Sequence, residues 1–184
     1  PSVIYVSPSG NDGDDGLSWP NAKKTITSAL SKAYYDDQIW VAGNSASPYV
    51  ERITLRAGVR LYGGFVGSES KLSERDHTTN ECILDGAGIG SVVTAAAGVD
   101  SAARIDGFTI RNGNGETGGG IQCLASAAPV IANNWIKYNY ASVRGGGIFC
   151  NYASPVLSNN RIEGNIALTG GGVACISSST PTLE

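Results

Sequence analysis

Gly118-Gly119-Gly120-Ile121-Gln122-Cys123 is the first of three copies of one motif, and the other two begin at Gly145 and Gly170. A proline follows each copy, at positions 129, 155 and 181, so these prolines are 26 residues apart. An Asn-Asn pair and an Ile-x-x-Asn segment return at the same interval. A fixed period of this size predicts a solenoid, in which each repeat is one coil that buries its apolar side chains by stacking on its neighbours.

The residues that fill the period favour β-coils over helical repeats, because they form short β-branched segments interrupted by Gly, Asn, Ser and Pro. Alternation places Ile121 and Cys123 on one face of a strand and Gln122 on the other. We therefore predict an all-β fold, a right-handed parallel β-helix with three short strands per coil and coils about 4.8 Å apart. The inward columns would be Ile121/Ile148/Val173, Cys123/Cys150/Cys175, Ile131/Leu157/Leu183 and Ile110/Ile136/Ile162.

Looser coils precede the regular repeats. We interpret four apolar runs as the starts of these coils: Ile39–Val41, Val59–Gly63, Ile83–Gly86 and Ile105–Gly107. The polar stretch at residues 67–81 predicts an excursion from the surface of the solenoid.

An amphipathic helix is predicted over residues 21–34, where Ile26, Ala29, Leu30 and Ala33 recur at helical spacing. We expect it to cap the N-terminal end of the solenoid, whose first strands would otherwise expose apolar side chains. The chain thus divides into an N-terminal strand, loop and capping helix at residues 1–38 and the coils at residues 39–184, all in one domain. Because the sequence stops within a coil, we expect it to be truncated at its C-terminus.

Composition narrows the range of partners. The 184 residues carry a net charge of −3 and no basic block, so nucleic acid is not expected to bind. No apolar run approaches the roughly 18 to 20 residues that span a membrane. Three of the four cysteines share one inward column, and we favour buried reduced thiols there; one strained disulfide and a metal site remain alternatives.

Several segments together resemble the N-terminal portion of bacterial right-handed parallel β-helix repeat proteins of the pectate-lyase-like superfamily. These segments are Ile4–Gly13, Asp15–Trp19, Leu61–Phe65, Ile83–Gly86 and Ile105–Ile110. The resemblance covers essentially the whole chain and implies the β-helix fold. Members of the superfamily include polysaccharide lyases, glycoside hydrolases and surface adhesins, so the resemblance implies several activities rather than one. The glycine-rich repeats also resemble those of outer-membrane autotransporter passengers.

The outward columns of the coils supply the candidate binding residues. Thr109, Trp135 and Arg161 form one column, and Arg111, Lys137 and Glu163 form the next, so we expect Trp135 to stack on Arg161 and Lys137 to pair with Glu163. These columns are either a solvated face or part of a sugar-binding strip. The aromatic residues of that strip would be Trp135, Tyr138, Tyr140, Phe149 and Tyr152.

Three further features are polar. The pairs Asn133/Asn159, Asn134/Asn160 and Asn139/Asn165 are interpreted as turn ladders that bond coil to coil. The loop holding Asp12, Asp14 and Asp15 is either a solvated turn or a calcium site. The only histidine, His77, lies in the long loop and is read as a surface or packing residue.

Three functions are compatible with these features. The first is an extracellular or cell-surface scaffold that binds a polysaccharide or a surface glycan and contains no complete catalytic site. The second is the N-terminal part of a polysaccharide lyase or glycoside hydrolase with its active coils further along the chain. The third is a structural module that self-associates through the open C-terminal coil. No cofactor is expected apart from the calcium considered above.

Overall fold

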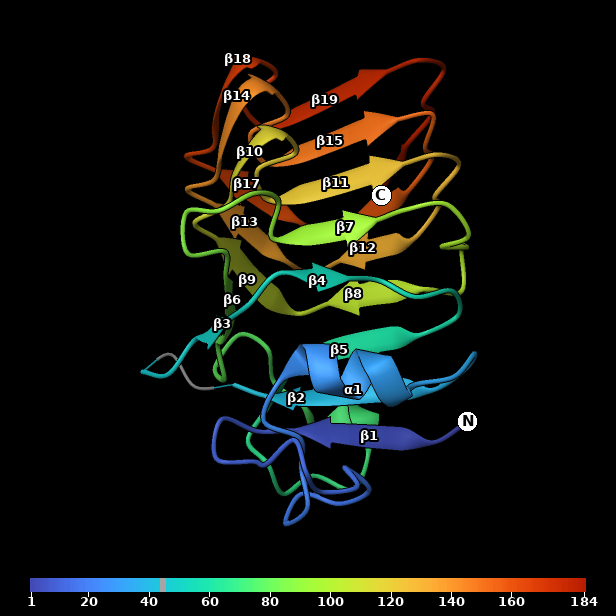
Figure 1. Cartoon of the computed structure of the whole chain (residues 1–184), viewed down its shortest axis with the longest axis vertical. Helices are drawn as coiled ribbons and strands as arrows, with labels where there is room; N and C mark the ends of the chain where they lie inside the picture. Colours follow the sequence, from blue (N-terminus) through green and yellow to red (C-terminus); the bar gives the residue numbers. More distant parts are fainter. Residues whose placement is uncertain (44–45) are drawn as a thin grey trace.

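The computed structural model describes residues 1–43 and 46–184, and it shows a parallel β-solenoid of about six turns. The strands stack into parallel sheets that form the walls of the solenoid (Figure 1). Sheet A contains β1 (Val3–Val6), β2 (Gln38–Ala42), β5 (Arg60–Phe65), β8 (Arg104–Asp106), β12 (Val130–Ala132), β16 (Val156–Ser158) and β20 (Thr182–Leu183). Sheet B contains β3 (Tyr49–Val50), β6 (Cys82–Asp85), β9 (Phe108–Arg111), β13 (Trp135–Lys137) and β17 (Arg161–Glu163).

Sheet C contains β4 (Ile53–Thr54), β7 (Val93–Ala95), β11 (Ile121–Leu124), β15 (Ile148–Asn151) and β19 (Val173–Ile176). A short sheet D, formed by β10 (Asn114–Thr117), β14 (Tyr140–Arg144) and β18 (Ile166–Thr169), lies between sheets B and C along the chain. The regular coils therefore carry a fourth strand that the sequence pattern did not predict. Its side chains are mostly exposed or only partly buried, so the strand lacks the regular buried apolar positions by which a strand is recognised in a sequence.

The predicted inward columns are confirmed by the pairing register. Cys123 lies beside Cys150, and Cys150 lies beside Cys175. Ile136 lies between Ile110 and Ile162 in the same way. Within the described residues all cysteines are free, as expected for a column of reduced thiols. Cys175 is exposed because β19 is the last strand of sheet C.

Two of the three predicted asparagine ladders run through the corners of the regular coils. The prediction for Asn133 and Asn159 is wrong, because the side-chain amide of Asn133 donates to Asp106 instead. Asn139 accepts a hydrogen bond from the backbone N–H of Gly113 at 2.9 Å and donates to the carbonyl of Ile110 at 3.0 Å. Asn165 repeats the pattern one coil later, with the N–H of Asn139 at 3.0 Å and the carbonyl of Ile136 at 2.8 Å. Asn134 and Asn160 form the second ladder. Each amide thus satisfies backbone groups that a sharp corner would leave unpaired.

The N-terminal helix is shorter than predicted. Helix α1 covers Ile26–Lys32 and is capped by Thr25, whereas the prediction began at residue 21. The preceding residues are extended because Lys23 pairs with the backbone of β1 at Tyr5 and Ser7. The apolar side of α1 packs against β1, β2 and β4 and closes the core at the level of the first strands (Figure 1). Since β1 pairs with β2, residues 1–38 contribute the first strand of sheet A.

One predicted coil start is wrong. The run Ile83–Gly86 was aligned with Ile105–Gly107, but β6 belongs to sheet B and pairs with β9. Ile105 instead lies beside Leu61 in sheet A. The insertion at residues 67–81 adds length between β5 and the next strand. The run Ile83–Gly86 therefore lies in sheet B, whereas an even spacing of coils would place it in sheet A.

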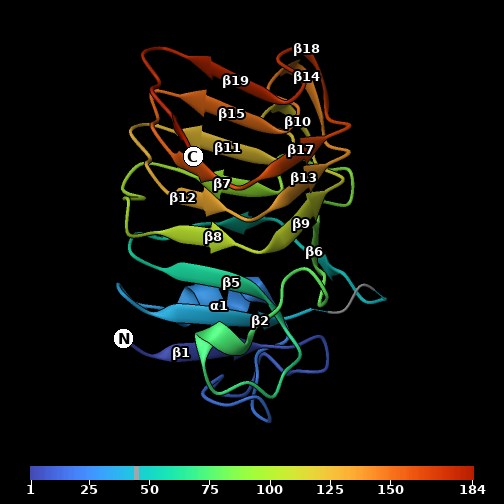
Figure 2. The ribbon, with the colours of Figure 1, turned by 180° about the vertical axis from the view of Figure 1, so that it is seen from behind.

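The insertion, which we call the strap (residues 67–81), leaves the coil as predicted but folds back onto the solenoid. It contains the short 3₁₀ helix η1 (Leu72–Glu74) and packs on the outer face of sheet A near β1 and β2 (Figure 2). Leu72 contacts a small aromatic cluster that includes Trp40, Tyr62 and Phe65. The ring of Trp40 stacks on that of Phe65, with centroids 4.7 Å apart. This second core explains why Trp40 and Tyr62, which lie on the outer face of sheet A, are buried.

Candidate functional site

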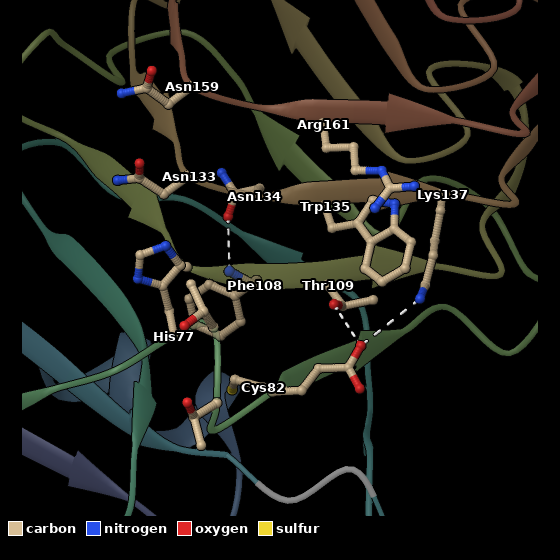
Figure 3. A pocket seen from close by; sticks show the side chains of 14 residues that line it. His77, Cys82, Phe108, Thr109, Asn133, Asn134, Trp135, Lys137, Asn159 and Arg161 are labelled. Atoms are coloured by element: carbon tan, nitrogen blue, oxygen red, sulfur yellow. Dashed lines mark hydrogen bonds and ion pairs between the residues drawn. The ribbon is translucent and has the colours of Figure 1, made fainter.

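A groove with a volume of about 650 Å³ lies between the strap and the outer face of sheet B. His77, Thr78 and Thr79 from the strap form one wall (Figure 3). The other wall comes from three successive coils, so the groove runs along the axis of the solenoid. Its residues on that side include Phe108, Thr109, Asn133, Asn134, Trp135, Lys137, Asn159 and Arg161.

Arg75 fixes the strap to the outer face of sheet A. The guanidinium of Arg75 pairs with the carboxylate of Asp106 at 2.5 Å, donates to the carbonyl of Gly63 at 2.9 Å and lies over the ring of Tyr62. Asp106 is buried and also pairs with Arg104 at 2.7 Å. Burial raises the pKa of Asp106, but the hydrogen bond and charge of Arg75 outweigh it, and the pKa lies below its ordinary value. The carboxylate therefore stays ionised and holds the strap.

His77 is positioned by glycines. A Cβ at Gly64 would lie 2.4 Å from the Cα of His77, and a Cβ at Gly107 would lie 2.9 Å from its Cβ. Both glycines have a positive φ, 94° and 82°. The backbone conformation and the close contact with His77 therefore both favour glycine at each position. The close approach brings His77 over the corner between sheets A and B, next to Asn133 and Phe108 (Figure 3).

Trp135 lies at the centre of the sheet B wall. The guanidinium of Arg161 lies over its ring with Cζ 4.5 Å from the centroid, which confirms the predicted stacking. The ammonium of Lys137 lies 3.2 Å from the same centroid, and the indole N–H donates to Glu163 at 3.2 Å. The ring is therefore held rigidly by its neighbours.

The predicted ion pair between Lys137 and Glu163 does not form. The two residues are neighbours in register, but Glu163 pairs with Arg161 at 2.6 Å. Lys137 pairs instead with Glu81 at the end of the strap, at 3.8 Å. Glu81 also accepts a hydrogen bond from Thr109 at 2.8 Å. The sequence pattern could not indicate this partner, because Glu81 reaches the groove only when the strap folds back.

The predicted aromatic strip is not assembled on one face. Trp135 lies on sheet B, Tyr140 lies on sheet D, and Tyr138 lies in the turn between them. Phe149 is in sheet C and Tyr152 follows it at the next corner. All five belong to one coil, so they encircle the axis, whereas a strip along one face needs equivalent residues of successive coils.

Among these five residues, exposure also differs. Phe149 is 3% exposed, so it offers no surface to a ligand. The rings of Tyr138, Tyr140 and Tyr152 are exposed, yet none of them lines the groove. Trp135 is the one predicted aromatic residue that does.

The predicted calcium loop holds a lysine. The ammonium of Lys23, a buried residue, donates to the backbone carbonyls of Asp12 at 2.8 Å and of Asp14. The carboxylate of Asp12 accepts from the backbone N–H groups of Lys24 and Thr25, and that of Asp15 accepts from Leu17. In the described ranges no group of three or more His, Cys, Asp or Glu could hold a metal ion. The ammonium of Lys23 lies in the loop that the calcium alternative assigns to a cation.

The sequence analysis missed the strap wall of the groove. It interpreted His77 as a surface or packing residue and gave no role to Thr78, Thr79 or Glu81. The length of the insertion was the available signal, because long loops on a rigid scaffold often carry function.

Comparison with known proteins identifies a family. A family model described as a protein of unknown function, DUF1565, matches residues 8–182. The chain belongs to this family. No curated protein and no solved structure matches it. The DUF1565 chain contains no helix that is long and apolar enough to cross a membrane, among the residues described.

Proposed function

We propose that this DUF1565 protein is an extracellular or cell-surface scaffold that binds a polysaccharide in the groove between the strap and sheet B. The observation that carries the proposal is the shape and lining of this groove. It extends across three coils, and hydroxyl, amide and imidazole groups line it around the edge of Trp135. Concave sites with an aromatic residue and a few positioned polar groups suit ligands rich in hydroxyl groups.

The rigidity of the lining supports binding. Asn134 is buried and bonded into a ladder, Trp135 is held by two cations and an acid, and the strap is fixed through Arg75. A ligand would therefore meet a largely preformed wall and would lose less free energy in ordering it.

Affinity electrophoresis through gels that contain different polysaccharides tests the proposal. We expect at least one polysaccharide to retard the protein, and Trp135→Ala to weaken that retardation about tenfold. Tyr152→Ala is the matched control, because Tyr152 is exposed and lies outside the groove; it should bind like the wild type. An equal loss of retardation in both variants would contradict binding in the groove and would favour binding by the aromatic residues that encircle the axis.

The other two functions give different outcomes in the same samples. Release of reducing ends or unsaturated uronides from a bound polysaccharide would favour an enzyme. Concentration-dependent association in sedimentation without any ligand would favour a self-assembling module.

A further inference from the structure

The charged side chains in the groove between the strap and sheet B are already neutralised by one another. Lys137 pairs with Glu81 at 3.8 Å, and Arg161 pairs with Glu163 at 2.6 Å. Two cations and two carboxylates therefore leave these four side chains with no net charge.

Both cations are also held against the same ring. The ammonium of Lys137 lies 3.2 Å from the centroid of Trp135, and Cζ of Arg161 lies 4.5 Å from it. The side chain of Lys137 is only 13% exposed. A ligand carboxylate that approached this ammonium would also approach the carboxylate of Glu81, which the hydrogen bond from Thr109 holds in place, so the two negative charges would repel each other.

Two polar side chains in the groove are available to a ligand. Within the part of the chain that the structure describes, the imidazole of His77 and the side-chain amide of Asn159 form no hydrogen bond with another residue. Both groups can donate and accept hydrogen bonds, as sugar hydroxyls also do.

We propose that the groove selects an uncharged polysaccharide and rejects polyuronates and sulfated chains. This inference rests on the proposed function and adds the class of ligand. An acidic chain would bring unpaired negative charge into a partly buried groove whose cations are already paired, whereas a neutral chain would meet hydroxyl, amide and imidazole partners.

Two pairs of polysaccharides that share a backbone test the inference at about pH 7, where the carboxylates of the acidic members are ionised. The pairs are hydroxyethyl cellulose with carboxymethyl cellulose, and fully methyl-esterified homogalacturonan with polygalacturonate. We expect the neutral member of at least one pair to retard the wild-type protein about tenfold more strongly than its acidic partner, at low and at high salt.

Glu81→Gln sharpens the test, because Gln keeps an acceptor for Thr109 but leaves Lys137 without its carboxylate. We expect this variant to gain about tenfold in retardation by the acidic polysaccharide. Glu116→Gln changes the net charge equally at an exposed position on β10, outside the groove, and should behave like the wild type.

The outcomes separate the two proposals. Equal or stronger retardation of the wild type by the acidic chains would overturn the neutral selectivity while leaving the binding function in place. Retardation by neither member of either pair, nor by any other polysaccharide, would overturn both. An identical gain in the two glutamine variants would show that net charge, rather than Glu81, governs the response, and would also overturn the inference.

Discussion

The regular coils after residue 104 and the N-terminal coils satisfy their irregular backbone by different chemical groups. In the regular coils, neutral amides such as Asn134 and Asn139 bond one coil to the next. In the N-terminal part, carboxylates accept the backbone N–H groups of loops. Glu69 accepts from Val66, Gly67 and Ser68 at 2.6 to 3.0 Å.

This difference follows from the repeat. A corner that recurs every 26 residues can stack identical amides, each of which bonds forward and backward. A loop that occurs once has no equivalent neighbour, so one side chain must accept several local donors, and a carboxylate with two oxygens does so well. The comparison predicts that the two regions respond differently to mutation and to pH.

The largest effect is expected from breaking an amide ladder. Asn139→Leu removes the acceptor of the Gly113 N–H and the donor to the Ile110 carbonyl at a buried position. Because unsatisfied buried polar groups cost about 1 to 3 kcal/mol each, we expect the free energy of unfolding in urea to fall by about 3 kcal/mol.

Asn159→Gly is the control for the ladder variant. Asn159 has a φ of 52°, and Gly107 has the equivalent corner position two coils earlier, so glycine should be tolerated within about 0.5 kcal/mol. If both variants lose the same stability, the ladders do not distinguish the regular coils.

A smaller effect is expected at the strap. Arg75→Ala leaves buried Asp106 with Arg104 and Asn133 but without its shortest ion pair. We expect a loss of about 2 kcal/mol in unfolding free energy, together with faster amide hydrogen exchange at residues 67–80. Since the strap forms one wall of the groove, polysaccharide retardation should weaken as well.

Arg60→Ala is the matched control for the strap, because it removes an ion pair with Asp36 whose side chains are both substantially exposed. Its expected effect is below about 0.5 kcal/mol. Unchanged hydrogen exchange of the strap in Arg75→Ala would show that apolar packing alone holds it.

The smallest expected change in stability per residue comes from lowering the pH. Hydrogen bonds from Thr78 and Thr79 hold the pKa of Asp76 below its ordinary value. Burial raises the pKa of Glu69, but the bonds from Val66, Ser68 and Gly67 outweigh it and lower the pKa. A carboxylate with a lowered folded-state pKa stabilises the fold above its unfolded pKa, and that stabilisation is lost as the pH falls through the folded pKa.

Hydrogen exchange at about pH 5 and about pH 3, corrected for intrinsic rates, measures this effect. We expect the loops at residues 66–80 to lose protection at the lower pH while the amide ladders keep theirs. Equal loss in both regions would contradict the difference between amide and carboxylate chemistry.

The regular repeats explain how much of the fold could be predicted from the sequence. Register was predictable for Cys123, Ile131 and Trp135 because each has an equivalent residue one coil later. The sequence did not predict the fourth sheet, the residue at which α1 begins or the sheet to which Ile83–Gly86 belongs. Irregular spacing in these segments hides which strand pairs with which. Of the five predicted aromatic residues, Trp135 is the one that lines the groove, together with Thr109, Lys137 and Arg161 from the predicted outward columns.

The 26-residue period was enough to predict the solenoid, its inward columns and two of its asparagine ladders, because a fixed period forces equivalent residues to stack. The groove, the partner of Lys137 and the position of Lys23 among backbone carbonyls emerge in the folded chain alone. The first two depend on where the strap folds back onto the coils, and the third depends on the loop that contains Asp12 and Asp14. The position of the strap is set by contacts such as Arg75 with Asp106, which join residues that no period relates.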